Sequence, residues 1–256
     1  MSFDIEAACG CFIGNTRTQN QDNFCFNNKH LPKENKGLKT PVIFNGNTND
    51  VVLFSVFDGM GGEVKGEEAA FIASEVFSQE VRQLDEIIIP GKDFLYETCL
   101  KANKKIVDSA AEMQINTMGT TVVALYFSQN EVFVCNIGDS KAFRIRNSQM
   151  IQISEDHTDE KILKSIGIDK KPVLLQYLGM SDTEIVLEPY ISKGELQSGD
   201  IYVICSDGVT DELSTDMIYQ IIKSNKTSKE TVNSVITTLQ KGDGNDNSTI
   251  IVIKIS

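Results

Sequence analysis

The chain has 256 residues, of which 41% are hydrophobic and 23% charged, and its formal net charge is -12. This composition predicts a globular protein with a large core, and the acidic balance argues against nucleic acid or anionic membranes as partners, because both bind cationic side chains. No apolar run approaches the roughly 18 residues of a membrane span, and the N-terminal residues do not resemble a signal peptide, so we expect a cytoplasmic protein.

The strand candidates are short apolar runs bounded by turn residues. The run at residues 51–57 is nearly continuous and ends in Asp58-Gly59, as expected of a buried strand. Residues 120–127, 131–137 and 142–146 are joined by short connections, which predicts an antiparallel meander. The other strand candidates are residues 7–13, 184–191, 201–205 and 249–255.

The helix candidates show apolar residues at helical spacing. Strands come in groups along the chain, and so do helices, whereas strict alternation of strand and helix is absent. This order favours a β-sandwich covered by helices over a doubly wound parallel sheet. The polar segment 27–49 is expected to be an excursion between strands. The helix candidates are residues 66–84, 94–113, 217–223 and 231–239.

Aspartates stand repeatedly at the ends of the predicted strands: Asp58, Asp139, Asp207 and Asp246, with Asp22 after the first strand. Each of them alone is compatible with an ordinary turn, because Asp and Asp-Gly are common in turns. If the strands share one sandwich, however, these carboxylates meet at one rim, where they repel one another unless a cation or protons neutralise them. Oxygen ligands without Cys or His suit Mg²⁺ or Mn²⁺ rather than zinc.

A pair of such cations can activate a water molecule and clamp a phosphoryl group during in-line displacement. Phosphate recognition then favours a bidentate cation, and Arg17 is the arginine that lies within a few residues of a candidate ligand while standing in a predicted loop. A surface salt bridge of little energetic value is the alternative role for Arg17.

The cysteines show no Cys-x-x-Cys spacing, and the chain has only two histidines. We expect buried thiols in a reducing compartment, with a redox or metal role as the alternative. A Cys/His zinc site is not expected. The six cysteines are Cys9, Cys11, Cys25, Cys99, Cys135 and Cys205.

Seven short motifs follow one another along the chain. They are RTQNQD at residues 17–22, VFDGMGG at 56–62, MGTT at 118–121, NIGDSKA at 136–142, SEDHT at 154–158, CSDGVTD at 205–211 and DNST at 246–249. In this order they resemble the motifs of the metal-dependent protein serine/threonine phosphatases, the protein phosphatase 2C family. A single DGMGG would be weak evidence, but seven ordered motifs across a domain-length chain are specific.

The resemblance implies an α+β fold in which a central antiparallel β-sandwich is flanked by helices on both sides, in four layers α-β-β-α. It also implies a binuclear Mn²⁺ or Mg²⁺ centre in a cleft at one end of the sandwich. In that centre Asp58 would bridge the two metals, Gly59 would offer its carbonyl group, and Asp22 would act through metal-bound water. Asp207 and Asp246 would bind one metal directly.

The same resemblance assigns Arg17 to the substrate phosphate. Asp139, together with Asp207, is similar to the pair that holds a third, weaker metal in bacterial members, and Asp211 matches another acidic position near that site. The implied reaction is hydrolysis of phosphoserine and phosphothreonine in proteins, in which a metal-bridging hydroxide attacks phosphorus in line.

The chain departs from the family pattern at three positions beside these residues. Lys141 replaces the usual Arg, with the charge retained. Gln21 stands where many members have Glu. Met60 replaces the histidine that eukaryotic members carry, which favours the bacterial branch and leaves the general acid open. His157 is the nearest histidine by motif, but we expect it to brace a loop rather than to donate a proton.

We expect one catalytic domain over residues 1–256, with a substrate-selecting flap at about residues 156–183. The expected partners are phosphorylated proteins that a serine/threonine kinase produces, and the expected state is a monomer. The main alternative is a catalytically silent family member that serves as a regulatory binding module. A small-molecule phosphatase, a dedicated regulator of one switch protein and a Ca²⁺-binding structural protein are further alternatives.

Overall fold

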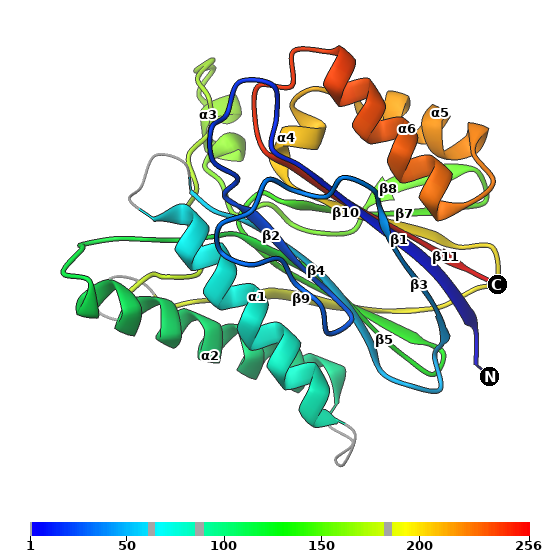
Figure 1. The fold of residues 1–256 in the computed structure, drawn as a ribbon, viewed down its shortest axis with the longest axis horizontal. Helices are drawn as coiled ribbons and strands as arrows, with labels where there is room; N and C mark the ends of the chain where they lie inside the picture. The colour runs from blue at the N-terminus through cyan, green and yellow to red at the C-terminus, as the bar shows by residue number, and fades with distance from the viewer. Residues whose placement is uncertain (1, 61–64, 85–89, 182–185) are drawn as a thin grey trace.

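Two antiparallel β-sheets packed face to face form the centre of the molecule, and helices cover both outer faces (Figure 1). The computed structural model describes residues 2–60, 65–84, 90–181 and 186–256. One sheet has six strands in the order β3-β1-β11-β10-β7-β8, and the other has five in the order β2-β4-β5-β6-β9. This arrangement is the predicted α-β-β-α class, which is therefore confirmed.

The strands vary in length from four to nine residues. In chain order they are β1 (Asp4–Phe12), β2 (Asp22–Phe26), β3 (Val42–Asn47), β4 (Val52–Asp58), β5 (Val122–Ser128), β6 (Glu131–Ile137), β7 (Lys141–Arg146), β8 (Gln149–Gln152), β9 (Tyr190–Glu195), β10 (Ile201–Cys205) and β11 (Ser248–Ile255). The helices are α1 (Gly66–Gln83), α2 (Gly91–Glu112), α3 (Glu160–Ser165), α4 (Asp207–Thr210), α5 (Thr215–Ser224) and α6 (Ser228–Lys241).

The burial of strand β4 explains why its sequence is apolar apart from Ser55 and the terminal Asp58. Leu53 and Phe57 pack into the cluster between the five-stranded sheet and helices α1 and α2. Val52, Phe54 and Val56 point the other way, into the cluster between the two sheets. Alternate residues of a strand face opposite sides, so a strand that is covered on both sides needs apolar residues at every position.

The helices close the outer faces of the two sheets. Helices α1 and α2 lie on the five-stranded sheet, and α5 and α6 lie on the six-stranded sheet (Figure 1). Helix α6 begins with a capping box, in which Thr227 and Glu230 each accept a hydrogen bond from the backbone of the other. None of the described helices is long and apolar enough to cross a membrane.

The predicted meander is wrong at its third strand. Strands β5 and β6 pair with each other, but β7 pairs with β10 and β8 in the other sheet. The chain crosses between sheets at Gly138, whose φ is +103° and where a Cβ atom would lie 2.6 Å from Thr121 Cγ2. A short Gly-Asp-Ser connection can therefore change sheets as well as form a hairpin.

Other boundaries also differ from the predictions. The strand predicted at residues 184–191 begins only at Tyr190, directly after Pro189, which has no N–H to donate to a ladder. Residues 184 and 185 of that prediction lie outside the described part of the chain. The segment 27–49 is more than an excursion, because it contains β3.

Candidate metal centre and active site

Five of the predicted aspartates lie at the same end of the two sheets. Strand β2 begins at Asp22, which is directly opposite Asp58 at the end of β4, and Asp139 follows β6. In the other sheet Asp207 follows β10 and Asp246 precedes β11, which is its neighbour. Because antiparallel neighbours end and begin at the same edge, both sheets bring their aspartates to one rim.

A cleft with a volume of about 590 Å³ lies at this rim. Loops from both sheets form it, together with residues 171–174 of the segment predicted to be a flap. Thr121 also lines the cleft, although the sequence analysis assigned it no role. Six of the predicted site residues line the cleft: Arg17, Asp58, Gly59, Asp139, Asp207 and Asp246.

Gly59 holds the turn after β4 in a space that no other residue fits. A Cβ atom there would lie 2.3 Å from the carbonyl oxygen of Gly66 and 2.7 Å from that of Gln21. The N–H of Gly59 donates a hydrogen bond of 3.2 Å to the same Gln21 oxygen. The close approach fixes the end of β4 against the start of α1. Gly61 and Gly62, the rest of the predicted metal-binding turn, lie outside the described residues.

Asp22 is only 1% exposed and does not line the cleft itself. Its Oδ2 accepts hydrogen bonds from Ser206 Oγ at 2.8 Å and Thr249 Oγ1 at 2.7 Å. Its Oδ1 has no hydrogen-bond partner among the described residues. A buried oxygen without a hydrogen-bond partner lowers the free energy of unfolding by about 1–3 kcal/mol. A ligand bound to this atom would remove that cost.

The carboxyl groups at the rim make one another harder to ionise. Burial raises the pKa of Asp22 to about 7, and the charges of Asp207 and Asp246 add to the effect. Burial and then Asp207 raise the pKa of Asp139 to about 6. The pKa of Asp58 lies well above its ordinary value because of burial, followed by the charges of Asp22 and Asp207. A cluster of this kind gains from a bound cation, which removes the repulsion.

The donor chemistry of the cluster fits Mn²⁺ or Mg²⁺. Every candidate ligand offers oxygen, the charges share one sign, and Asp22 Oδ1 lacks a hydrogen-bond partner among the described residues. Within the described ranges, no three Asp, Glu, His or Cys residues already converge closely enough to hold an ion. Asp246 Oδ2 is paired with Arg17 Nη2 at 2.7 Å, so this contact would have to open before that oxygen could bind an ion.

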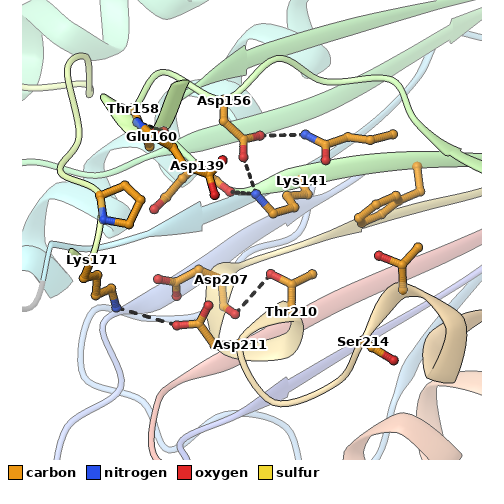
Figure 2. Close-up of a pocket in the computed structure, with 14 residues that line it drawn as sticks. Asp139, Lys141, Asp156, Thr158, Glu160, Lys171, Asp207, Thr210, Asp211 and Ser214 are labelled. Atoms are coloured by element: carbon orange, nitrogen blue, oxygen red, sulfur yellow. Dashed lines mark hydrogen bonds and ion pairs between the residues drawn. The ribbon is translucent and has the colours of Figure 1, made fainter. Parts of the chain in front are cut away.

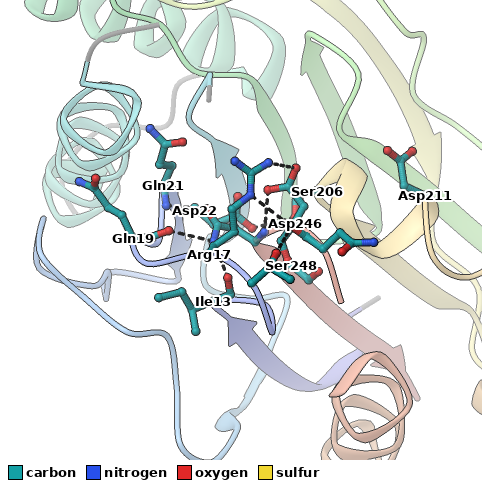
Figure 3. Close-up of polar contacts among 12 residues, drawn as sticks. Ile13, Arg17, Gln19, Gln21, Asp22, Ser206, Asp211, Asp246 and Ser248 are labelled. Atoms are coloured by element: carbon teal, nitrogen blue, oxygen red, sulfur yellow. Dashed lines mark hydrogen bonds and ion pairs between the residues drawn. The ribbon is translucent and has the colours of Figure 1, made fainter. Parts of the chain in front are cut away.

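The loop that carries Arg17 is hydrogen-bonded to the segment directly before β11 (Figure 3). Arg17 Nε donates to the carbonyl oxygen of Asn245 at 3.2 Å. Asn247 accepts a hydrogen bond from the N–H of Gln21 at 2.8 Å and donates to the carbonyl oxygens of Ile13 and Gln19. Sequence reasoning missed this role of Asn247. The only indication in the sequence was an amide side chain directly after the candidate ligand Asp246.

Asp211 lies beside the cleft rather than in it. It lines a neighbouring cavity of about 450 Å³, which shares Asp139, Lys171 and Asp207 with the cleft (Figure 2). Lys171 Nζ is 3.6 Å from Asp211 Oδ2. Lys141, at the edge of the same cavity, forms an ion pair with Asp156. The structure therefore places Asp211 in a cavity that the predicted third-metal pair also lines, where Asp211 is paired with Lys171.

His157 contacts a loop and not the cleft. Its Nδ1 accepts a hydrogen bond of 3.3 Å from the N–H of Gly138, the residue at which the chain changes sheets. Burial lowers the pKa of His157, which favours the neutral ring that can accept this bond. The placement agrees with the expected bracing role.

The family model described as Protein phosphatase 2C matches residues 43–241. The chain belongs to the protein phosphatase 2C family. Arg17, Asp22 and Asp246 lie outside the matched segment, so their placement rests on the geometry described above.

Two bacterial relatives of this protein phosphatase 2C chain have similar sequences. The serine/threonine phosphatase stp of Listeria monocytogenes is 29% identical over 238 residues, which cover 88% of this chain and 91% of that one. The serine/threonine protein phosphatase PstP of Mycobacterium tuberculosis is 28% identical over 79% of this chain and 40% of its own length. The bacterial branch predicted from Met60 is confirmed.

Solved structures show the same fold. The catalytic domain of PstP in complex with two manganese ions superposes with a TM-score of 0.79 at 24% identity, and covers 100% of this chain and 99% of that one. A bacterial serine phosphatase superposes with a TM-score of 0.80 at 22% identity, over 98% and 97% of the two chains.

The raised pKa values predict how pH affects the metal-free protein. In the unfolded chain Asp titrates near 4, whereas folded Asp22 and Asp139 titrate at about 7 and about 6. Between these values the unfolded chain loses its protons first, so the free energy of unfolding falls as pH rises. In EDTA, we expect the Tm to fall between about pH 5 and about pH 7.5, as measured by calorimetry.

The Asp139→Asn variant provides the control, because it removes one of the titrating groups, and its Tm in EDTA should fall less over the same range. Mn²⁺ displaces protons from the cluster, so it should raise the Tm more at the upper end of the range than at the lower. A metal-free Tm that stays level or increases with pH would contradict the electrostatic description.

Proposed function

We propose that this chain is a metal-dependent phosphatase that hydrolyses phosphoserine and phosphothreonine in proteins. The observation that carries the proposal is the convergence of aspartates from both sheets with Arg17 at one cleft. Membership of the protein phosphatase 2C family and the names of the Listeria and Mycobacterium relatives support it. The two manganese ions in the PstP structure support Mn²⁺ as the cofactor.

The residues present would hold two cations at the rim. Asp58 would bridge them, the carbonyl group of Gly59 and the carboxylates of Asp207 and Asp246 would complete the direct ligands, and Asp22 would act through water. When bound, such a pair would act as a Lewis acid toward the phosphoryl oxygens and lower the pKa of a water molecule. Asp139, with Asp207 and the nearby Asp211, would hold a third, weaker cation.

The side chains of the cleft then do two things. Arg17, whose guanidinium group lines the cleft, binds the phosphate of the substrate once it releases Asp246. The aspartates neutralise the cations and fix their positions. Met60 also lines the cleft, but a thioether cannot donate a proton to the leaving serine or threonine oxygen, so the general acid is not the side chain at this position.

In this proposal the attacking oxygen comes from water, and the chain offers no accessible thiol that could form a covalent intermediate instead. All six cysteines are buried. Burial raises the pKa of Cys11, Cys25 and Cys205 to about 12, so these side chains stay as unreactive thiols. One P–O bond to water forms while the bond to serine or threonine breaks.

The flap at residues 156–183 selects the substrate in this proposal. Its described part, which ends at residue 181, contains α3 and contributes residues 171–174 to the cleft. Lys171 places a positive charge there, on a molecule that is acidic as a whole. Steering of an anionic phosphoprotein must therefore be local. A solvated helix and loop without influence on specificity is the alternative.

We further propose that residues 1–256 form one catalytic domain that acts as a cytoplasmic monomer and opposes a serine/threonine kinase. A silent regulatory module is the second candidate, but the aspartates at the metal positions are all present. Turnover of a phosphothreonine peptide with Mn²⁺, and its loss in EDTA, tests the proposal. No turnover of that peptide or of para-nitrophenyl phosphate would favour the silent module.

The Asp207→Asn variant should lose Mn²⁺-dependent cleavage of a phosphothreonine peptide, because the amide cannot neutralise a cation. We expect kcat/KM to fall by at least about 100-fold, as for other groups that stabilise transition-state charge. Asp243→Asn makes the same chemical change at an exposed loop position and is the control. Near-normal turnover by Asp207→Asn would refute its place in the metal centre.

The Arg17→Ala variant should raise KM for phosphate esters without weakening Mn²⁺ binding. A charge-assisted hydrogen bond contributes about 1.5–3 kcal/mol, which predicts roughly a 10- to 100-fold change in KM. Steady-state kinetics and a Mn²⁺ titration measure the two effects. Arg82→Ala, at the end of α1 where the side chain contacts the carbonyl oxygen of Asn28, is the control. Weaker Mn²⁺ binding with an unchanged KM would contradict the assignment.

The Lys171→Ala variant should raise KM for phosphopeptides with acidic residues beside the phosphate, because it removes the cation that the flap brings to the cleft. We expect a change of roughly 2- to 10-fold, and no change for para-nitrophenyl phosphate. Lys161→Ala removes an exposed flap lysine that pairs with Glu155 and serves as the control. Identical effects of the two variants would argue against a specific role for Lys171.

A further inference from the structure

The carboxyl group of Asp22 is held in a way that the metal-site residues alone do not explain. Two hydroxyl groups, Ser206 Oγ at 2.8 Å and Thr249 Oγ1 at 2.7 Å, donate to the same oxygen, Oδ2 (Figure 3 shows Ser206 and Asp22). Both donors are 0% exposed, and Asp22 is 1% exposed. The other oxygen, Oδ1, has no hydrogen-bond partner in the described part of the chain.

The two donors belong to the sheet opposite Asp22. Asp22 begins β2 of the five-stranded sheet, whereas Ser206 follows β10 and Thr249 lies in β11 of the six-stranded sheet. The donors are also fixed to each other, because the N–H of Thr249 donates to Ser206 Oγ at 2.9 Å and the N–H of Ser206 donates to the carbonyl oxygen of Thr249. The hydroxyl groups therefore approach Asp22 from a rigid base.

The neighbouring contacts orient the hydroxyl hydrogens. Thr249 Oγ1 lies 2.7 Å from the carboxylate and 3.3 Å from Cys11 Sγ. A hydroxyl group has one hydrogen, and the charged oxygen is the stronger acceptor, so Thr249 donates to Asp22. The backbone N–H that reaches Ser206 Oγ occupies an acceptor position of that oxygen, which leaves the hydroxyl hydrogen of Ser206 for Asp22.

Two hydrogen bonds to one oxygen fix the rotation of the carboxyl group. The χ2 angle of an aspartate is otherwise broad and nearly two-fold, so the two oxygens of a free carboxyl group exchange places easily. Here an exchange would break both bonds at once. Asp22 is directly opposite Asp58 in the ladder between β2 and β4, and directly opposed residues place their side chains on the same face of a sheet. The Asp22 carboxyl group is thus held on the same face of the sheet as that of Asp58, with Oδ1 free of hydrogen bonds to the described residues.

We propose that Ser206 and Thr249 are positioning residues that together hold the Asp22 carboxylate with Oδ1 available to the divalent-cation centre. This inference rests on the proposed function. Partners that orient the residues around a metal influence its affinity strongly, and their loss costs about 10- to 100-fold in binding or activity. Neither residue touches substrate or metal in this scheme, since both act through Asp22.

The test measures Mn²⁺ binding to the full chain by calorimetry, without reference to turnover. We expect Ser206→Ala and Thr249→Val each to weaken Mn²⁺ binding by at least about tenfold. Ser206→Thr and Thr249→Ser retain the hydroxyl group and should bind Mn²⁺ nearly as the wild type does. Ser206→Cys keeps the size of the side chain but is a weak hydrogen-bond donor, so its Mn²⁺ affinity should lie between those of the two groups of variants. It replaces Ser206→Ala in the test if that variant fails to fold.

Two controls separate this role from general stabilisation of the core. Ser55→Ala removes a buried hydroxyl group of β4 that has no hydrogen-bond partner among the described residues. Thr98→Val removes a buried hydroxyl group of α2 that donates to the carbonyl oxygen of Phe94 at 2.7 Å. Both controls should leave Mn²⁺ affinity unchanged, whatever they do to the metal-free Tm.

The outcomes distinguish this inference from the proposed function. If the wild type binds Mn²⁺ and cleaves a phosphopeptide, and the apolar variants bind Mn²⁺ equally well while only their Tm falls, the positioning role is wrong and the function stands. If the wild type neither binds Mn²⁺ nor cleaves the peptide, both are wrong. Weak binding by the hydroxyl-retaining variants, equal to that of the apolar ones, would also overturn the positioning role.

Discussion

The crowding of like charges at one rim is the constraint on which the rest of the structure depends. Asp22, Asp58, Asp139 and Asp207 are each harder to ionise because of burial and because of their neighbours. Such a cluster stays in a folded protein only where protons, cations or hydrogen bonds offset the repulsion. The two packed sheets form a rigid frame that keeps the four carboxyl groups close together despite their repulsion.

The fold class was predictable because burial leaves a clear pattern in the sequence. Strands β4 and β10 are covered on both faces, and their continuous apolar runs placed them almost to the residue. The edge strand β3 and the short β8 have exposed positions and no such run, so nothing in the sequence marked them. The partner of β7 depends on the backbone at Gly138, which a local pattern does not reveal.

The site was predictable to the extent that its residues follow strand ends. The aspartates were found because a carboxylate next to an apolar run can be recognised from the sequence alone. The family motifs then suggested their roles. The motifs also contain Asn247, Thr121, Ser206 and Thr249, but a sequence pattern does not show what these side chains contact. Their contacts join segments about 40 to 230 residues apart, as for Thr249 with Ser206 and Asn247 with Gln21, and arise only when the two sheets pack.

The burial of all six cysteines has a consequence for the chemistry of the cell. Phosphatases that attack with a thiolate stop working when peroxide or an alkylating agent modifies that sulfur, because the thiolate is the reactive species. This chain keeps its thiol groups within the core, away from such reagents. It is thus suited to continue removing phosphate during oxidative stress, when thiol-dependent enzymes have been silenced.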